Sequence, residues 1–284
     1  MNRRKIHILF LTILICRITS AAKLSSLPGG LLFPAFSNAS LVNSAAMSLD
    51  WRQEAKVLYS PSLNQDQPHG YLVGLGYSNA ILGMNLGYLG SYQDSSTYDS
   101  IFSGISFRMS RLSIGTSFRK VQLESGNPIQ TDVSAVLILS PITRMGAVVY
   151  QLGDEPQIGA GIGFGRLGKQ TLSADVLFPA KPKGKGMVDQ YAANLSFTDN
   201  RESFAYSLGM RFSRQQDGFS NESQISGNVG AAFPISKSVN VTSLYHSNPH
   251  TITFGFVWLW TPPAEQYIQM YKSENLNTIW NTKR

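Results

Sequence analysis

The chain has 284 residues, of which 14% are charged, whereas a soluble globular domain usually has about 25%. Its formal net charge of +7 falls to about +3 once the cations of the first 17 residues are set aside, which excludes the charge footprint of a nucleic-acid-binding protein. The one cysteine, Cys16, excludes a disulfide framework.

The N-terminus has the three parts of a secretory signal peptide. Arg3, Arg4 and Lys5 are followed by the apolar residues 6–16 and then by the small residues Ser20, Ala21 and Ala22. We predict a signal peptide over residues 1–22, cleaved after Ala22 or, as the alternative, after Ala21. A lipoprotein would use Cys16, but bulky Ile15 stands where a small residue is needed. The mature chain would then begin near residue 23, outside the cytoplasm.

Residues 23–50 are rich in small and apolar residues and show no strand alternation. From Trp51 onward the chain divides into segments of about ten residues in which apolar side chains occupy every second position, the weak repeated signature of transmembrane β-strands. We count about fourteen such segments, namely 54–60, 71–77, 81–89, 101–109, 112–120, 132–139, 145–152, 158–165, 171–178, 191–197, 204–212, 225–233, 239–245 and 251–260. The segment 145–152 is ambiguous in phase.

The connections between these segments alternate in length. Longer polar stretches, such as 91–100 and 179–189, alternate with tight links such as Ser110-Arg111. Outer-membrane barrels have short periplasmic turns and longer outer loops. A secreted β-sandwich, the competing interpretation, does not require connections that alternate in length. The sequence therefore predicts an all-β fold: a transmembrane, antiparallel, up-and-down β-barrel of about 14 strands over residues 51–261.

Residues 163–168 match the G-x-G-x-x-G nucleotide-binding pattern. The match lies in a run with glycine at 159, 161, 163 and 165, and another alternating segment follows it where a helix would be required. We interpret these glycines as an inward face without side chains, to which another part of the chain can approach closely.

The segment 253–260 has the arrangement of a final barrel strand, with Thr253, Gly255, Trp258 and Trp260 at positions one, three, six and eight. It resembles the sorting signal that the barrel-assembly machinery reads, and its aromatic residues would form a lipid-facing row. Pro262-Pro263 ends the strand. Residues 262–284 are predicted to form a short C-terminal periplasmic helix, with a loosely ordered tail as the alternative.

A barrel of about fourteen strands has a lumen wide enough to hold another part of the chain. Because residues 23–50 are rich in small and apolar residues, we predict that they insert into the lumen as an N-terminal plug. At this point the chain resembles the long-chain fatty-acid transporter family and its relatives. Those barrels have fourteen strands and an N-terminal hatch with an Asn-Pro-Ala element. Residues 41–48 resemble that element, with Asn43 and Ala45 matching and Ser44 in place of proline. The resemblance implies a hatch over residues 23–50 and a hydrophobic small-molecule ligand.

The predicted inward positions include a small set of polar residues that would either contact a ligand or hold the plug: Asn85, Arg108, Arg119, Asp175 and Arg211. Arginine binds carboxylates through paired hydrogen bonds, but a buried arginine also needs partners when no ligand is bound. We expect no catalytic residues, because His246 and His250 flank a turn with Ser247 without forming a triad by themselves. We expect neither a metal site nor a cofactor.

The sequence thus predicts a non-enzymatic channel in the outer membrane of a Gram-negative bacterium, which admits small hydrophobic or amphipathic molecules past the plug. Two alternatives stay open: a general porin for small polar solutes, and a structural protein that oligomerises through its wall or tail. The expected partners are outer-membrane lipid, the barrel-assembly machinery, a hydrophobic ligand and a further copy of the chain, but no nucleic acid. The channel hypothesis also predicts a lateral gap or a kink in the wall beside the plug.

Overall fold

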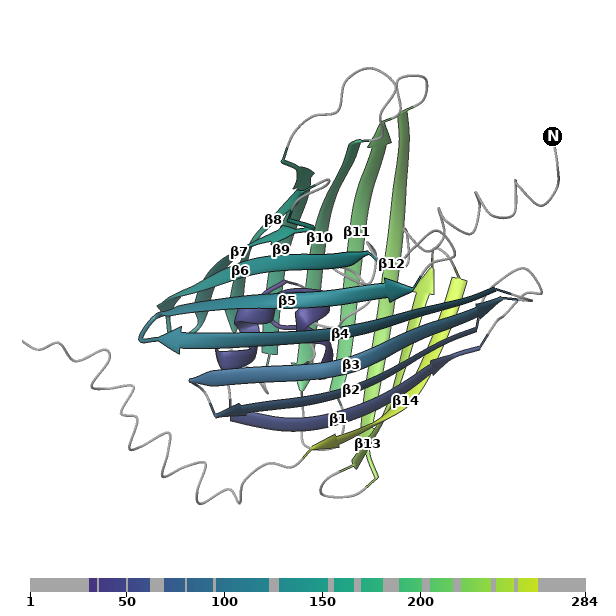
Figure 1. The fold of residues 1–284 in the computed structure, drawn as a ribbon, viewed down its shortest axis with the longest axis horizontal. Helices are drawn as coiled ribbons and strands as arrows, with labels where there is room; N and C mark the ends of the chain where they lie inside the picture. The colour runs from purple at the N-terminus through teal and green to yellow at the C-terminus, as the bar shows by residue number, and fades with distance from the viewer. Residues whose placement is uncertain are drawn as a thin grey trace, which may run out of the picture.

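The computed structural model shows a closed barrel of 14 antiparallel strands, which confirms the predicted fold class (Figure 1). It describes residues 31–34, 36–49, 51–61, 69–79, 81–93, 96–122, 128–152, 156–165, 170–180, 189–200, 205–216, 221–235, 239–247 and 250–259. The strands are β1 (Trp51–Ser60), β2 (His69–Asn79), β3 (Leu82–Gln93), β4 (Ser96–Met109), β5 (Leu112–Gln122), β6 (Ile129–Ser140), β7 (Thr143–Tyr150), β8 (Gln157–Gly165), β9 (Gln170–Pro179), β10 (Asp189–Asn200), β11 (Ala205–Gln216), β12 (Asn221–Pro234), β13 (Val239–Ser247) and β14 (His250–Leu259).

The two faces of each strand differ in burial because neighbouring side chains point to opposite sides of the wall. In β9, for example, Thr171, Ser173 and Asp175 are buried inside, whereas Leu172 and Val176 are exposed outside. The same exposed apolar face continues around the barrel, including Leu75, Leu86, Ile101, Ile105, Phe118, Leu195, Leu208 and Phe254. An apolar outer band is what a bilayer requires of a membrane-spanning barrel.

The first and last strands close the wall. β1 pairs with β14, with Ala55 opposite Trp258 and Val57 opposite Phe256. Every strand is therefore hydrogen bonded to a neighbour on each side, and no unpaired edge is left among these strands.

The described residues before β1 lie inside the ring of strands. They form two short 3-10 helices, η1 (Phe36–Leu41) and η2 (Ser44–Leu49), which are seen behind β2–β5 in Figure 1. η1 contacts β1–β5 and η2 contacts β2–β6, and all side chains of η2 are buried. We call residues 31–34 and 36–49 the inner segment.

One local expectation is wrong. The polar stretch 91–100 is not a long loop, because β3 and β4 continue through most of it, with Ser91 opposite Tyr98 and Gln93 opposite Ser96. Backbone pairing does not require an alternating apolar face. Pairing between the described strands is continuous around the barrel, and β6 has a register shift against β7 between Ile138 and Ser140.

Among the residues that the structure describes, no helix is long and apolar enough to cross a membrane. The predicted signal peptide, Trp260 and the C-terminal residues 262–284 lie outside the described residues.

Candidate functional site: the inner segment and the lumenal wall

The inner segment rests on wall positions that have no side chain. A Cβ atom added to Gly115 in β5 would lie 2.4 Å from the backbone nitrogen of Ala45 and 2.6 Å from the carbonyl carbon of Ser44. At Gly83 in β3 it would lie 2.6 Å from the Cβ of Met47. Only glycine leaves room for a backbone this close to the wall.

Serine hydroxyls of β5 and β6 hold η2 in this position. The backbone nitrogen of Ala45 donates to Ser134 Oγ at 2.9 Å, and Ser113 Oγ donates to the Ala45 carbonyl at 2.6 Å. Two hydroxyl pairs add to this contact, Ser44 with Ser134 at 2.9 Å and Ser48 with Ser113 at 2.6 Å. The polar groups of a buried helical turn are thus satisfied by the wall, as burial requires.

Asn43 connects the two ends of the inner segment. Its Nδ2 donates to the Leu31 carbonyl at 3.1 Å, and its Oδ1 accepts from the Ala45 nitrogen at 3.1 Å. Tyr150 of β7 donates its hydroxyl to the Val42 carbonyl at 2.7 Å. Of the two residues of the hatch-like element, Ala45 therefore lies at the contact between segment and wall, whereas the Asn43 side chain hydrogen bonds within the segment.

An apolar cluster fills the space between the inner segment and the wall from β6 to β10. Its buried members are Leu31, Leu32, Phe33, Val42, Ala45, Ala46, Leu49, Val136, Val148, Tyr150, Leu177 and Ala192. Arg144 of β7 places its guanidinium 5.1 Å from the centroid of the Phe33 ring, a cation–π contact. Several inward side chains of this part of the barrel are therefore apolar because they meet protein and not water.

The glycine run of β8 has the role expected for it. A Cβ at Gly163 would lie 2.6 Å from the Phe33 ring, and one at Gly161 would lie 2.3 Å from Asp175 Oδ1. The strand pairs on both sides as an ordinary wall strand. The match to a nucleotide-binding pattern is a coincidence of glycine at every second position.

Two of the predicted lumenal residues lie in one row. Asp175 of β9 stands opposite Asn194 of β10, which stands opposite Arg211 of β11, and all three are buried inside. The Asp175 carboxylate accepts from the Leu31 nitrogen at 3.0 Å and from Ser173 Oγ at 2.8 Å. Asp175 thus holds the start of the inner segment, while Arg211 stands two strands away.

The other predicted lumenal residues are dispersed. Arg119 is buried near the far end of β5 and hydrogen bonds to Gln130, whereas Arg108 lies at the opposite end of the same hairpin, two residues before the turn at Ser110. Asn85 is buried in β3, beside the wall that η1 and η2 contact. Arg119 and Arg211 nevertheless both lie within electrostatic range of the Tyr150 hydroxyl on β7.

In the final strand, two residues of the predicted assembly signal pair with β1: Gly255 stands opposite Leu58 and Trp258 opposite Ala55. Gly255 lies close to β1, because a Cβ there would be 2.1 Å from the Val57 carbonyl. Thr253 shares the face of Gly255, while Trp258 points to the other face, where the centroid of its ring lies 5.9 Å from that of the tilted Phe256 ring.

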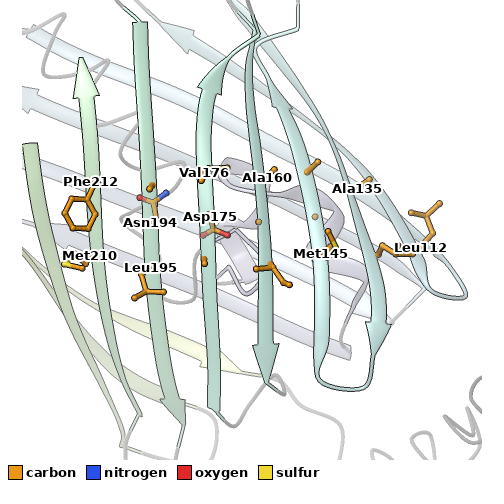
Figure 2. Close-up of a pocket in the computed structure, with 17 residues that line it drawn as sticks. Leu112, Ala135, Met145, Ala160, Asp175, Val176, Asn194, Leu195, Met210 and Phe212 are labelled. Carbon is orange, nitrogen blue, oxygen red and sulfur yellow. The ribbon is translucent and has the colours of Figure 1, made fainter. Parts of the chain in front are cut away.

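The outer face of the wall is hollowed over β5–β11. Figure 2 shows this hollow from outside, with Leu112 and Phe212 at its two ends and the helical inner segment behind the strands. Its volume is about 930 Å³. Small residues, among them Ala135, Ala160 and Gly161, form part of the floor, and Met145, Leu195 and Met210 add bulk around it.

The described residues include no group of three or more side chains that could hold a metal ion. The two histidines near the β13–β14 connection face different surroundings. His246 is half-buried on the inner side of β13, whereas the His250 ring is exposed and its Nδ1 hydrogen bonds with the Tyr245 hydroxyl at 2.7 Å. Ser247 Oγ accepts from the Gly227 nitrogen at 2.7 Å.

Sequence reasoning missed the residues that seat the inner segment, notably Ser113, Ser134 and Tyr150. The serines occupy inward positions of β5 and β6, where any small polar residue would fit, so no signal distinguished them. Tyr150 had a signal in the ambiguous phase of 145–152, because a strand with apolar residues on both faces indicates that protein covers its inner side.

Comparison with known proteins agrees with the fold. No protein-family model and no curated protein sequence matches this chain. Among solved structures, the "CymD monoaromatic hydrocarbon channel" superposes with a TM-score of 0.57 and 10% sequence identity, covering 84% of this chain and 99% of that one. The Pseudomonas putida toluene transporter TodX gives a TM-score of 0.54 and 10% identity, covering 84% and 97%. The resemblance to the fatty-acid transporter family is confirmed at the level of the fold.

Proposed function

We propose that this protein is an outer-membrane channel that admits small hydrophobic or amphipathic molecules past an N-terminal plug. The observation that carries the proposal is the seating of the inner segment on the lumenal wall by Ser113, Ser134, Tyr150 and Asp175. A barrel that only anchors a surface structure needs no such fitted inner part. An open porin would be obstructed by it.

The outer surface supports a hydrophobic cargo. The hollow over β5–β11 is bordered by apolar side chains. On the opposite, lumenal side of the same wall, Leu31 packs against Gly159 and Leu32 packs against Gly146. A molecule released toward this side would meet apolar surface continuous with the bilayer core. The solved neighbours CymD and TodX are, by their names, channels for monoaromatic hydrocarbons and toluene.

The proposal divides the chain as the sequence does. Residues 1–22 are a signal peptide that directs export, residues 23–50 are the plug, residues 51–261 are the transmembrane barrel, and residues 262–284 are a periplasmic extension. Thr253, Gly255, Trp258 and Trp260 form the signal that the assembly machinery reads. Asn43 and Ala45 act as hatch residues: Asn43 holds the plug together through Leu31 and Ala45, and Ala45 fixes it to the wall.

The test is uptake of radiolabelled toluene by a Gram-negative host that produces the mature barrel with and without residues 23–50. We expect uptake to be lost in the deletion, because the plug supplies the apolar surface that receives the ligand. An unchanged rate would count against the proposal. Heat-modifiable migration on gels reports whether the deleted protein still forms a barrel.

A second variant keeps the test valid if the deletion does not fold. Asn43→Ala removes the hydrogen bonds to Leu31 and Ala45 without removing the segment. We expect it to raise single-channel conductance in planar bilayers from near zero to intermittent openings. A large steady conductance in the unmodified protein would favour the porin alternative.

A further inference from the structure

The hollow over β5–β11 lies on the outer face of the wall, and part of its floor is a row of methyl groups (Figure 2). Ala135, Ala147 and Ala160 stand directly opposite one another on β6, β7 and β8. Larger outward side chains border this row on both sides along the strands: Leu137, Met145 and Ile162 on one side, and Val133, Val149 and Ile158 on the other. The hollow therefore contains a groove that crosses the strands and is one row of alanines wide.

The hollow is apolar throughout. Among the described residues that line it, Asp175 is the only ionisable one, and its carboxylate faces the lumen, where it accepts from the Leu31 nitrogen at 3.0 Å. The volume of 930 Å³ falls in the range of about 300–1,000 Å³ that is typical of small-molecule sites. An unfilled hollow would lose van der Waals contacts along its floor, so an apolar group from the bilayer has to occupy it.

The hollow begins at one end of the barrel. Leu112, which lines it, is the first residue of β5, whereas Phe212 at its other end lies past the middle of β11. The end at Leu112 is periplasmic by the length of its connections, because the longest there, such as 166–169, have four residues, whereas 61–68 and 180–188 at the other end have eight and nine. The groove thus rises from the periplasmic boundary of the membrane, as an acyl chain of the periplasmic leaflet does.

A cation stands at this periplasmic mouth of the hollow. Arg111 is exposed and directly precedes Leu112 in the turn between β4 and β5. Its carbonyl accepts from the Ile138 nitrogen at 2.8 Å, which extends the pairing of β5 with β6 by one residue and holds the turn beside the hollow. A guanidinium at this place matches a lipid phosphate, because arginine binds phosphate oxygens through paired hydrogen bonds.

We propose that the hollow binds one acyl chain of an anionic phospholipid from the periplasmic leaflet and that Arg111 binds its phosphate. Lipid tails are as apolar as the wall, so the preference for this place comes from packing in the groove and from the charge at its mouth. The unbranched side chains of Met145 and Met210 adapt to the shape of the chain. The site lies outside the lumen and does not depend on the proposed channel function.

Native mass spectrometry tests the acyl-chain site. The mature protein is incubated in detergent with equal amounts of phosphatidylglycerol and phosphatidylcholine that carry identical chains. The unmodified protein should retain one lipid and favour phosphatidylglycerol about threefold to fivefold, as expected for an exposed charge pair. Ala147→Leu fills the middle of the groove and should lower the retention of both lipids about tenfold. The matched control is Ala231→Leu, which enlarges an outward alanine of β12 away from the hollow and should leave retention unchanged.

The headgroup site has its own pair of variants. Arg111→Gln should keep the lipid but remove the preference for phosphatidylglycerol. Arg214→Gln removes an exposed arginine of β11 at the opposite end of the wall and should leave the preference intact. A preference lost in Arg214→Gln alone would place the headgroup in the other leaflet and overturn the assignment. Undiminished retention in Ala147→Leu would also overturn it, as would a lipid-free dimer that Ala147→Leu dissociates, because a second copy would then fill the hollow.

Discussion

Replacing Gly115 with alanine should unseat the inner segment while leaving the barrel intact. The added Cβ would lie 2.4–2.7 Å from three atoms of Ser44 and Ala45, two of them backbone atoms that the surrounding hydrogen bonds hold in place. Overpacking of a tight interface costs about 1–3 kcal/mol, and the two hydrogen bonds of Ala45 contribute about 1 kcal/mol each.

We therefore expect seating to weaken by about 3 kcal/mol, which is roughly a hundredfold in the equilibrium between seated and released segment. Hydrogen-exchange mass spectrometry of residues 31–49 measures that equilibrium directly, and thermal unfolding followed by circular dichroism measures the barrel separately. Exchange should accelerate roughly a hundredfold, while the barrel transition should not move, because the backbone pairing of β5 with β4 and β6 is unaffected.

The control is Gly227→Ala in β12, where a Cβ would meet its nearest atoms at 3.7 and 3.8 Å, an ordinary contact distance. It should change neither measurement. Unaltered protection of residues 31–49 in Gly115→Ala would refute the argument that the missing side chain is what admits the segment.

Three further changes test other parts of the structure. Tyr150→Phe removes the 2.7 Å hydrogen bond to the Val42 carbonyl and should raise the exchange rate of the inner segment roughly fivefold to tenfold; an unchanged rate would contradict its role. Leu86→Arg places a charge on the outer face and should lower the free energy of unfolding in lipid vesicles by about 2–4 kcal/mol, whereas Leu86→Phe should have little effect. Gly255→Val should slow assembly by opposing the pairing of β14 with β1; folding at the normal rate in vesicles would show that the seam tolerates a side chain.

The number of strands and the inward or outward direction of their side chains were predictable, because both depend only on the local alternation of apolar and polar residues. The outward positions of Val57, Leu86 and Phe254, and the inward positions of Asn85 and Asp175, follow from a period of two. Where the phase was ambiguous, at residues 145–152, the cause was a partner that lies more than 100 residues earlier in the chain: Tyr150 hydrogen bonds to Val42. Alternation cannot show that an inner face is covered by protein.

The candidate site was less predictable because it depends on register. The sequence places Asp175, Asn194 and Arg211 on inward faces, yet only the pairing of β9 with β10 and of β10 with β11 shows that they are neighbours. Arg108 carries the same sequence signal and lies at the end of β4, two residues before the turn at Ser110. Whether a polar group has a hydrogen-bond partner depends on how the lumen is packed, and no local sequence pattern shows this packing.

The position of the inner segment has a consequence for the order of assembly. It immediately precedes β1, and the surface on which its helices rest, β1–β6, comes from the first half of the chain. Strands β1–β6 can present that surface without the pairing of β14 with β1, so docking of the two helices does not require threading through a closed barrel. The pairing of β14 with β1 encloses the inner segment.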